Sequence, residues 1–218
     1  MSNLNNINIL VTAGPTWVPI DKVRVITNVF GGTLGAIIAS EAAKTGANVT
    51  LLFGPGKAQI PQNIKNLKII RYKFYDDLLR LVKGELKNGQ YDIMIHSSAV
   101  ADYTPILAKE GKIKSGKKEL IIRLKPTQKI VDLIKKISPK IFLVKFKLEV
   151  GLPKKKLVDV AYNSMVASKA DLIVANEYST VKKDHVAYII NNNRITLKVS
   201  GKNNIAKKLI DTICKSMN

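Results

Sequence analysis

The sequence has one cysteine, Cys214, among its 218 residues. A single cysteine excludes an internal disulfide and a zinc site built from cysteines, and we expect Cys214 to be inert in the closing helix. No apolar run reaches the roughly 18 residues that cross a bilayer, and the polar residues 1–6 do not resemble a signal peptide. These absences predict a cytoplasmic protein with no membrane partner.

Arginine is scarce, with five among 36 basic residues, although the formal net charge is +20. Such a charge suits nucleic-acid phosphates, but recognition of bases and phosphates commonly uses arginine forks. The sequence shows no helix-turn-helix, aromatic platform or arginine cluster. A basic nucleic-acid-binding module is therefore kept only as an alternative. Most of the excess charge follows residue 108, and we interpret it as a field for small anionic substrates combined with a solvated lysine-rich surface.

Apolar runs alternate with helical stripes along the chain, which predicts the α/β class. Continuous apolar strands separated by helices indicate a Rossmann-like open parallel sheet with helices on both faces. A hairpin is expected at the C-terminal end, where three asparagines separate two short runs. Without a linker or repeat, residues 1–218 are predicted to form a single domain. The expected strands are residues 7–12, 48–53, 67–72, 91–97, 119–124, 141–149, 171–175, 186–190 and 194–199, and the expected helices 32–45, 76–87, 128–137, 154–168 and 202–215.

Two segments do not fit this alternation. Residues 15–30 form an excursion over the carboxyl ends of the strands, the edge at which open α/β sheets bind ligands. Residues 103–118 hold five lysines and no apolar period, which predicts a long functional loop. An NAD(P)-type oxidoreductase is an alternative for such a sheet. The sequence opposes it, because the glycines do not form G-x-G-x-x-G and no acid follows residues 48–53.

Four sequence blocks occur in order over most of the chain. The first is V-T-A-G-P-T at residues 11–16, with P-I-D at 19–21 and V-R-V-I-T-N at 23–28. The second is S-A-V-A-D-Y at 98–103, with K-I-K at 112–114. The others are F-K-L-E at 146–149 and D-L-I-V-A-N at 171–176. In this combination the chain resembles the phosphopantothenate–cysteine ligase (phosphopantothenoylcysteine synthetase) family, in its archaeal-like version.

The resemblance implies a reaction of coenzyme A biosynthesis. CTP or ATP, with Mg²⁺, would activate 4′-phosphopantothenate as an acyl-nucleotide, and cysteine would then give 4′-phosphopantothenoylcysteine. The choice between CTP and ATP stays open. The resemblance also implies a homodimer, for which the late strands are the expected dimerisation strands. Many members of the family are fused to a flavin decarboxylase, and the sequence leaves open whether this chain is one half of such a fusion.

The resemblance also implies roles for individual residues. Catalytic roles fall on Asn28, which would hold the acyl-nucleotide, and on Lys112 of the lysine-rich loop. Substrate binding falls on Asn28, Ala99 and Arg24, although Arg24 would alternatively pair with Asp21. No metal ligands are assigned. The nucleotide is expected at Gly14, Gly32, Gly35, Ser98, Ala99, Asp102, Lys114, Pro126, Thr127, Phe146 and Lys169.

Two departures from the family pattern affect the phosphate contacts. Residues 30–33 read F-G-G-T where the family has two serines, a glycine and a cation. Ser164 and Ser168 occupy the positions of two lysines that often bind the triphosphate, with Lys169 beside them. The cations that replace these lysines stay unassigned. His96, inside an apolar strand, is predicted to be a core histidine.

Overall fold

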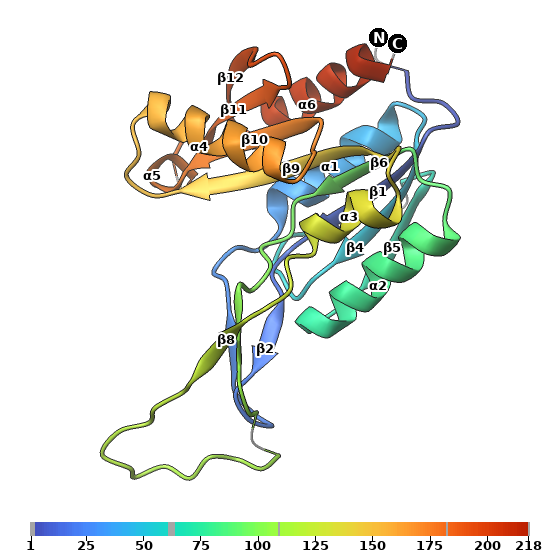
Figure 1. Cartoon of the computed structure of the whole chain (residues 1–218). Helices are drawn as coiled ribbons and strands as arrows, with labels where there is room; N and C mark the ends of the chain where they lie inside the picture. The colour runs from blue at the N-terminus through green and yellow to red at the C-terminus, as the bar shows by residue number, and fades with distance from the viewer. Residues whose placement is uncertain (1–2, 61–63, 109, 182, 218) are drawn as a thin grey trace.

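The apolar runs of the sequence form one eight-stranded sheet in the computed structural model, which describes residues 3–60, 64–108, 110–181 and 183–217. The order across the sheet is β12-β11-β10-β9-β6-β1-β4-β5 (Figure 1). Its strands are β1 (Asn8–Ala13), β4 (Asn48–Phe53), β5 (Leu67–Arg71), β6 (Ile93–His96), β9 (Phe142–Glu149), β10 (Leu172–Glu177), β11 (Val186–Asn191) and β12 (Thr196–Ser200).

Neighbouring strands run parallel from β10 through β9, β6, β1 and β4 to β5. The expected C-terminal hairpin is present, because β11 pairs antiparallel with both β10 and β12. These pairings confirm the predicted Rossmann-like sheet with a C-terminal hairpin. The carboxyl ends of the parallel strands therefore share one edge of the sheet.

Helices cover both faces because the central strands are apolar on both sides. Ile9 and Val11 of β1 join one apolar cluster, whereas Leu10 between them joins the other. Burying one such side chain fully stabilises the fold by about 1.5–3 kcal/mol. The first cluster contains α1 (Thr33–Lys44) and α6 (Lys202–Met217), and the second contains α2 (Tyr75–Asn88), α3 (Val131–Ile137) and α4 (Lys154–Ala167). A short helix, α5 (Tyr178–Val181), follows β10.

The two ends of the described chain lie together on one side of the sheet (Figure 1). Leu4 is buried in the same apolar cluster as α6, and its N–H donates to Thr45 O at 3.0 Å. Among the described residues, no helix has the length and apolar character that crossing a bilayer requires.

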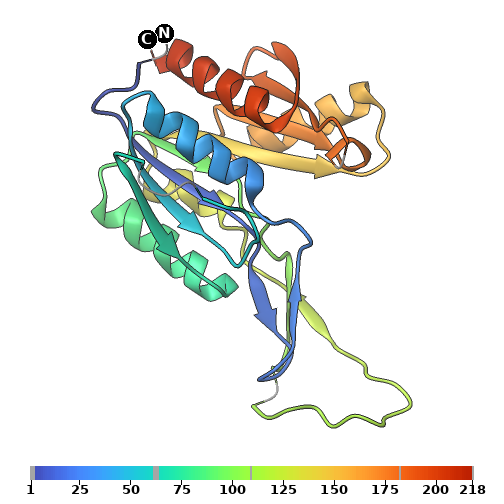
Figure 2. The same cartoon turned by 180° about the vertical axis from the view of Figure 1, so that it is seen from behind.

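The segments that did not fit the alternation form a projecting arm, which we define as residues 17–27 and 103–126 (Figures 1 and 2). Two short hairpins build it: β2 (Trp17–Pro19) pairs with β3 (Val25–Thr27), and β7 (Tyr103–Pro105) pairs with β8 (Leu124–Pro126). Trp17 packs edge-on against Phe74 at 6.4 Å between ring centroids, which fixes the base of the arm to the body.

The structure corrects two expectations within the arm. The predicted strand at residues 119–124 is wrong, because only Leu124 of that range belongs to a strand. Leu120 and Ile121 are exposed and have no sheet edge to pair with. The predicted loop at 103–118 in turn begins with the strand β7, and Lys109 within it lies outside the described residues.

Candidate active site

Two adjoining cavities open where the chain leaves the carboxyl ends of the central strands. The lysine cavity, of about 590 Å³, is lined by Thr127, Lys145, Ser164, Ser168 and Lys169 among others. The glycine cavity, of about 380 Å³, is lined by Asn28, the segment 31–35, Asn176, His185 and Lys202 among others. Both cavities are also lined by Ser98, Asp102 and Phe146.

Asn28 is held at the glycine cavity by the backbone of the second sequence block. It follows β3, and its Nδ2 donates to Ala99 O at 3.0 Å and to Val100 O at 3.4 Å. A nearby contact fixes the same junction, because Ala101 N donates to Thr16 Oγ1 at 2.9 Å. The amide oxygen of Asn28 keeps its acceptor capacity, and the carboxamide adds no charge. The first two blocks, 71 residues apart at Asn28 and Ala99, thus meet at one cavity wall.

The predicted glycines bring the start of α1 close to the end of β1. Gly32 has φ +83°, and a Cβ there would lie 2.8 Å from Gly14 Cα. A Cβ on Gly35 would lie 2.5 Å from the Cβ of Ala13. No side chain caps α1, and its first turn carries no acidic residue. Backbone N–H groups at such a helix start can bind an anion without side-chain hydroxyls.

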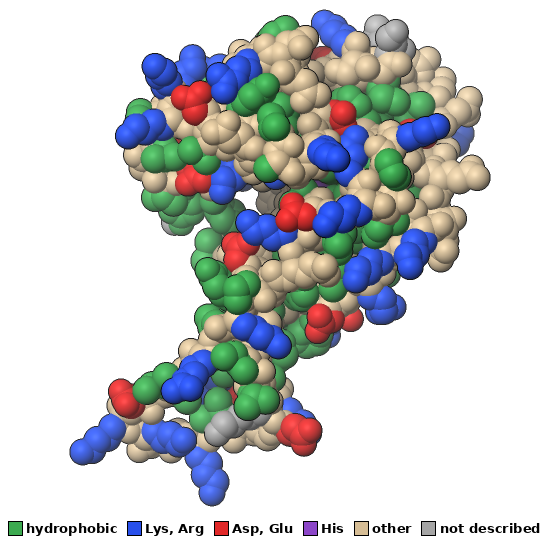
Figure 3. Space-filling model, viewed as in Figure 1, with side chains coloured by type: hydrophobic (Ala, Val, Ile, Leu, Met, Phe, Trp, Pro, Cys, Tyr) green, Lys and Arg blue, Asp and Glu red, His purple; other side chains and the backbone are tan. Residues whose placement is uncertain are grey.

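The lysine cavity carries an excess of positive charge. Among the described lining residues there are six lysines but only two carboxylates, those of Asp102 and Asp132. One of the lysines, Lys135, pairs with Asp171 at 2.8 Å. Basic side chains border the hollow above the arm in Figure 3. A concave surface of one sign concentrates ligands of the opposite sign, so the cavity suits phosphates. Its lysines are Lys129, Lys135, Lys136, Lys145, Lys147 and Lys169.

Thr127 and Asp102 are fixed to each other at the boundary of the two cavities. Thr127 N donates to Asp102 O at 2.9 Å, and Thr127 Oγ1 donates to Ala101 O at 2.6 Å. Ser98, also at the boundary, has its Oγ 2.8 Å from Tyr72 Oη. Burial raises the pKa of Tyr72 well above its usual range, so the phenol stays neutral.

Two histidines lie in the cavity walls and are neutral. His96 is buried with Nδ1 2.9 Å from Thr12 Oγ1. Burial, followed by the charge of Lys145, lowers the pKa of His96 to about 4. The prediction of a core histidine is thereby confirmed, although His96 also reaches the lysine cavity. His185 Nε2 lies 3.2 Å from Asn176 Oδ1, and burial likewise lowers its pKa.

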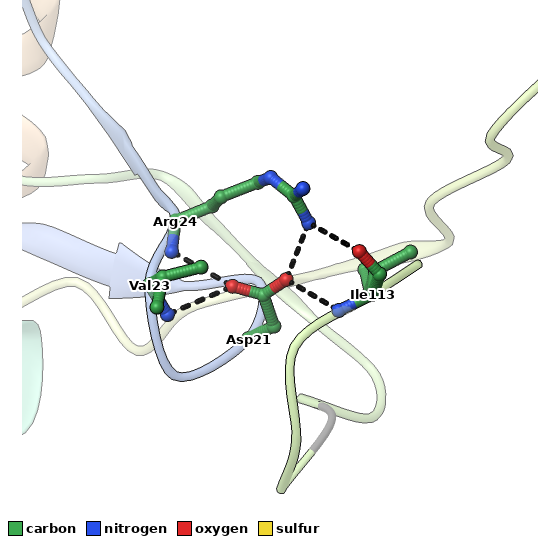
Figure 4. A network of polar contacts seen from close by, with 4 residues as sticks. All are labelled: Asp21, Val23, Arg24 and Ile113. Carbon is green, nitrogen blue, oxygen red and sulfur yellow. Dashed lines mark hydrogen bonds and ion pairs between the residues drawn. The ribbon is translucent and has the colours of Figure 1, made fainter. Parts of the chain in front are cut away.

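Arg24 pairs with Asp21, and together they hold the K-I-K segment (Figure 4). Asp21 Oδ2 accepts from Arg24 Nη1 at 2.6 Å and from Ile113 N at 2.9 Å. Arg24 Nη1 also donates to Ile113 O at 3.2 Å. Of the two roles weighed for Arg24, the structure shows the pairing. Lys112 and Lys114 stay exposed on either side of the buried Ile113.

These contacts lower the pKa of Asp21 from 3.8 to about 2, first of all through the hydrogen bond from Ile113 N. A depressed carboxylate pKa stabilises the folded contact above the unfolded pKa, and this is lost as pH falls through the folded value. We therefore expect the Ile113 amide to be protected from hydrogen exchange at pH 5 and to lose protection as the pH approaches 2.

The Asp21→Asn variant is expected to free the K-I-K segment without unfolding the body. The neutral amide loses the ion pair, so the Ile113 amide should exchange about tenfold faster. Hydrogen exchange followed by mass spectrometry measures this. Asp159→Asn is the matched control, because Asp159 lies on α4, outside the arm, and pairs with Arg194 at 4.0 Å. Equal protection of Ile113 in wild type and Asp21→Asn would contradict the role of the pairing.

The structure brings most predicted site residues together, but not all. Asn28, Gly32, Gly35, Ser98, Ala99, Asp102, Thr127, Phe146 and Lys169 line one or both cavities. Gly14 packs behind Gly32. The arm residues Arg24, Lys112, Lys114 and Pro126 are absent from the described linings. Sequence reasoning missed Lys145, and its signal was a lysine inside the apolar run of β9.

An open, mostly parallel α/β sheet with a lysine-lined cavity at its carboxyl edge is an arrangement that suits anionic ligands. Residues 4–217 match the DNA/pantothenate metabolism flavoprotein C-terminal domain. The chain belongs to this family.

Named relatives and solved structures agree with this membership. The chain is 38% identical over 174 residues to the coenzyme A biosynthesis bifunctional protein CoaBC of Thermococcus kodakarensis, covering 80% of this chain and 42% of that protein. It thus spans less than half the length of that relative. The DNA/pantothenate metabolism flavoprotein of Streptococcus pneumoniae superposes with a TM-score of 0.88 and 34% identity, covering 97% of this chain and 100% of that one. The C-terminal domain of a CoaBC protein superposes with a TM-score of 0.81 and 25% identity, covering 100% and 98%.

Proposed function

We propose that this chain ligates 4′-phosphopantothenate to cysteine at the expense of a nucleoside triphosphate, giving 4′-phosphopantothenoylcysteine in coenzyme A biosynthesis. The observation that carries the proposal is the hydrogen bond from Asn28 to Ala99 O at the glycine cavity. This contact joins the first two sequence blocks beside a second, lysine-lined cavity. Membership of the family and the name of the Thermococcus relative support the same reaction.

The two cavities suit the two halves of this reaction. A carboxylate oxygen of phosphopantothenate would attack the α-phosphorus of CTP or ATP, and the bond to pyrophosphate would break. The amine of cysteine would then attack the acyl carbon, releasing the nucleoside monophosphate and a proton. We place the triphosphate in the lysine cavity and phosphopantothenate in the glycine cavity. Asn28 then holds the acyl-nucleotide between them, with Asp102 and Phe146 against the nucleotide.

Magnesium fits this arrangement as a companion of the triphosphate. The described residues contain no cluster of three or more ligand-type side chains, as a site built only from protein would require. Mg²⁺ commonly uses one or two carboxylates together with substrate phosphates, and Asp102 and Asp132 line the lysine cavity. The ion would neutralise part of the phosphate charge.

A pyrophosphate-release assay tests the proposed reaction. The intact protein is incubated with phosphopantothenate and each of CTP, ATP, GTP and UTP, with and without cysteine. We expect release only when phosphopantothenate and CTP or ATP are both present, and the same panel decides between these two nucleotides. Absence of release with every nucleotide would overturn the proposed function.

We propose that the arm mediates a homodimer. Its exposed side chains include Leu107, which is 85% exposed, and Ile121, which is 73% exposed. Exposed apolar patches of this kind commonly mark protein interfaces. In the C-terminal hairpin, the expected dimerisation strands, Ile195 is the one large apolar side chain that is exposed among the described residues. The arm is therefore the better surface. Its exposed apolar residues are Val23, Tyr103, Ile106, Leu107, Leu120, Ile121 and Leu124.

Charging the arm is expected to give monomers. In the double variant Leu107→Asp/Ile121→Asp, burying two carboxylates would cost more than an interface of ordinary size can offset. Sedimentation velocity should show the wild type as a dimer and this variant as a monomer. The control is Ile195→Asp in the hairpin, which should stay dimeric. The reverse result would locate the dimer contact at the late strands.

A dimer formed through the arm would also give Arg24 and Lys112 a place to act. Both belong to the arm, and neither lines a cavity among the described residues of its own chain. We propose that, in the dimer, the arm of one protomer carries Lys112 and Arg24 to the cavities of its partner. Lys112 would then place its charge beside the phosphates at the time of reaction.

A further inference from the structure

Lys145 is a buried cation inside an apolar strand. It lies in β9 between Val144 and Phe146 and is 8% exposed. Its Nζ donates to Ser164 O at 2.9 Å, to Ser164 Oγ at 3.0 Å and to Ser168 Oγ at 3.1 Å. Ser164 belongs to α4 and Ser168 follows its last residue. The acceptors are neutral oxygens, so the hydrogen bonds are satisfied while the charge is not.

The ion pairs of the described residues do not include Lys145. Two neighbours on the same cavity are paired, since Lys135 contacts Asp171 at 2.8 Å and Lys147 contacts Glu149 at 2.9 Å. Buried charges in proteins are normally paired. Burial lowers the pKa of Lys145, and the more distant Asp132 only partly opposes this effect. An anion in the cavity would remove the imbalance.

The position of this charge matches the departure seen in the sequence. The resemblance implies lysines at positions 164 and 168, where this chain has serines. Lys145 reaches both hydroxyls from strand β9, so its ammonium lies beside these two positions. All three residues line the lysine cavity. The positive charge that the resemblance implies on helix α4 is supplied here from strand β9, at the same wall of the cavity.

We propose that Lys145 is the cation that binds the phosphate chain of the nucleoside triphosphate, with Ser164 and Ser168 holding its ammonium in place. The inference rests on the proposed function, because it places the triphosphate in the lysine cavity. A phosphate oxygen competes with the neutral Ser164 carbonyl for one N–H of the ammonium, since a charged acceptor makes the stronger bond. The Ser164 hydroxyl accepts from Lys145 and can donate its own hydrogen to the phosphate.

A purely structural role makes a different prediction. The Ser164 carbonyl lies in the last turn of α4, where a cation favours the helix end. If Lys145 only capped this helix, its removal would lower thermal stability and leave nucleotide affinity unchanged. The two roles therefore separate when affinity and stability are measured on the same variants.

The decisive experiment moves the charge back to the helix. In Lys145→Met, we expect the KM for CTP or ATP and the Kd for inorganic tripolyphosphate to rise about 10- to 100-fold, with a smaller change in kcat. In the double variant Lys145→Met/Ser168→Lys, most of that loss should be recovered. Lys140→Met is the matched control, because it removes the same charge from an exposed lysine outside both described linings. This substitution should change the KM by less than about threefold.

Unchanged nucleotide and tripolyphosphate affinity in a folded Lys145→Met protein would overturn the inference. If that variant releases pyrophosphate with the KM of the wild type, the inference about Lys145 is wrong, but the proposed ligase activity is still supported. Binding of CTP or ATP that depends on Lys145 supports the inference even if the wild type releases no pyrophosphate. Should Lys145→Met fail to fold, NMR of the wild type decides: the Lys145 ammonium should shift and its pKa should rise when tripolyphosphate is added, and an unmoved Lys145 signal overturns the inference.

Discussion

The Asn28→Asp variant is expected to lose overall ligation by about 100- to 1,000-fold, the cost of disturbing one preorganised polar group at a reacting centre. In the wild type, Asn28 Nδ2 donates to Ala99 O at 3.0 Å. A carboxylate oxygen in the same place would face that carbonyl as a second acceptor. It would also set a negative charge beside the acyl phosphate. Product formation from phosphopantothenate, cysteine and nucleotide measures the loss.

Two controls separate this effect from misfolding. Asn28 is exposed, so the substitution should leave the thermal unfolding midpoint close to that of the wild type. Asn193→Asp makes the same chemical change at an exposed position of the β11–β12 turn and should retain full turnover. Wild-type turnover in Asn28→Asp would show that the role carried over by the sequence resemblance does not apply here.

Coexpression of two inactive variants is expected to restore activity if the arm acts on the partner protomer. Lys112→Gln alone should lower turnover by about 10- to 100-fold, because a charge on the reacting phosphates is lost. In a hybrid dimer with Asn28→Asp, one cavity keeps Asn28 and receives an arm that keeps Lys112. Random pairing makes half of the dimers hybrids, so about a quarter of all sites should be intact.

The complementation has a built-in negative control. Pairing Asn28→Asp with the double variant Asn28→Asp/Lys112→Gln leaves no intact Asn28 and should restore nothing. If coexpression of the single variants also restores nothing, Lys112 acts on the cavity of its own chain. The activity of the purified mixture, compared at equal dimer concentration, distinguishes the two arrangements.

The central sheet was predictable because its strands are buried on both faces. Leu10 and Val11 point to opposite clusters, so β1 reads as a continuous apolar run. The arm offered no such signal. β7 contains only three residues, of which Pro105 alone is buried, and it pairs with β8. Leu120 and Ile121 looked like strand residues because they are apolar, but both are exposed and neither belongs to a strand.

The site was predictable in part through the resemblance. Sequence blocks identified Asn28 and Ala99 separately, and the structure adds the hydrogen bond between them. The sequence left Arg24 with two roles, because its contact with Ile113 spans 89 residues. Lys145 stands out locally only as a lysine inside the apolar run of β9, a pattern that does not show what it contacts. Its partners lie 19 and 23 residues away on another element, and only tertiary structure brings them together.

The neighbouring ends of the chain make the protein suitable for circular permutation. Leu4 and α6 lie in one cluster, on the side of the molecule away from the arm (Figure 2). Closely spaced surface ends can be joined by a short linker, with new ends opened in an exposed loop. New ends in the exposed segment 117–120 would keep both cavities intact while cutting the tip of the arm. In such a permutant, the arm could be altered independently of the body that holds the two cavities.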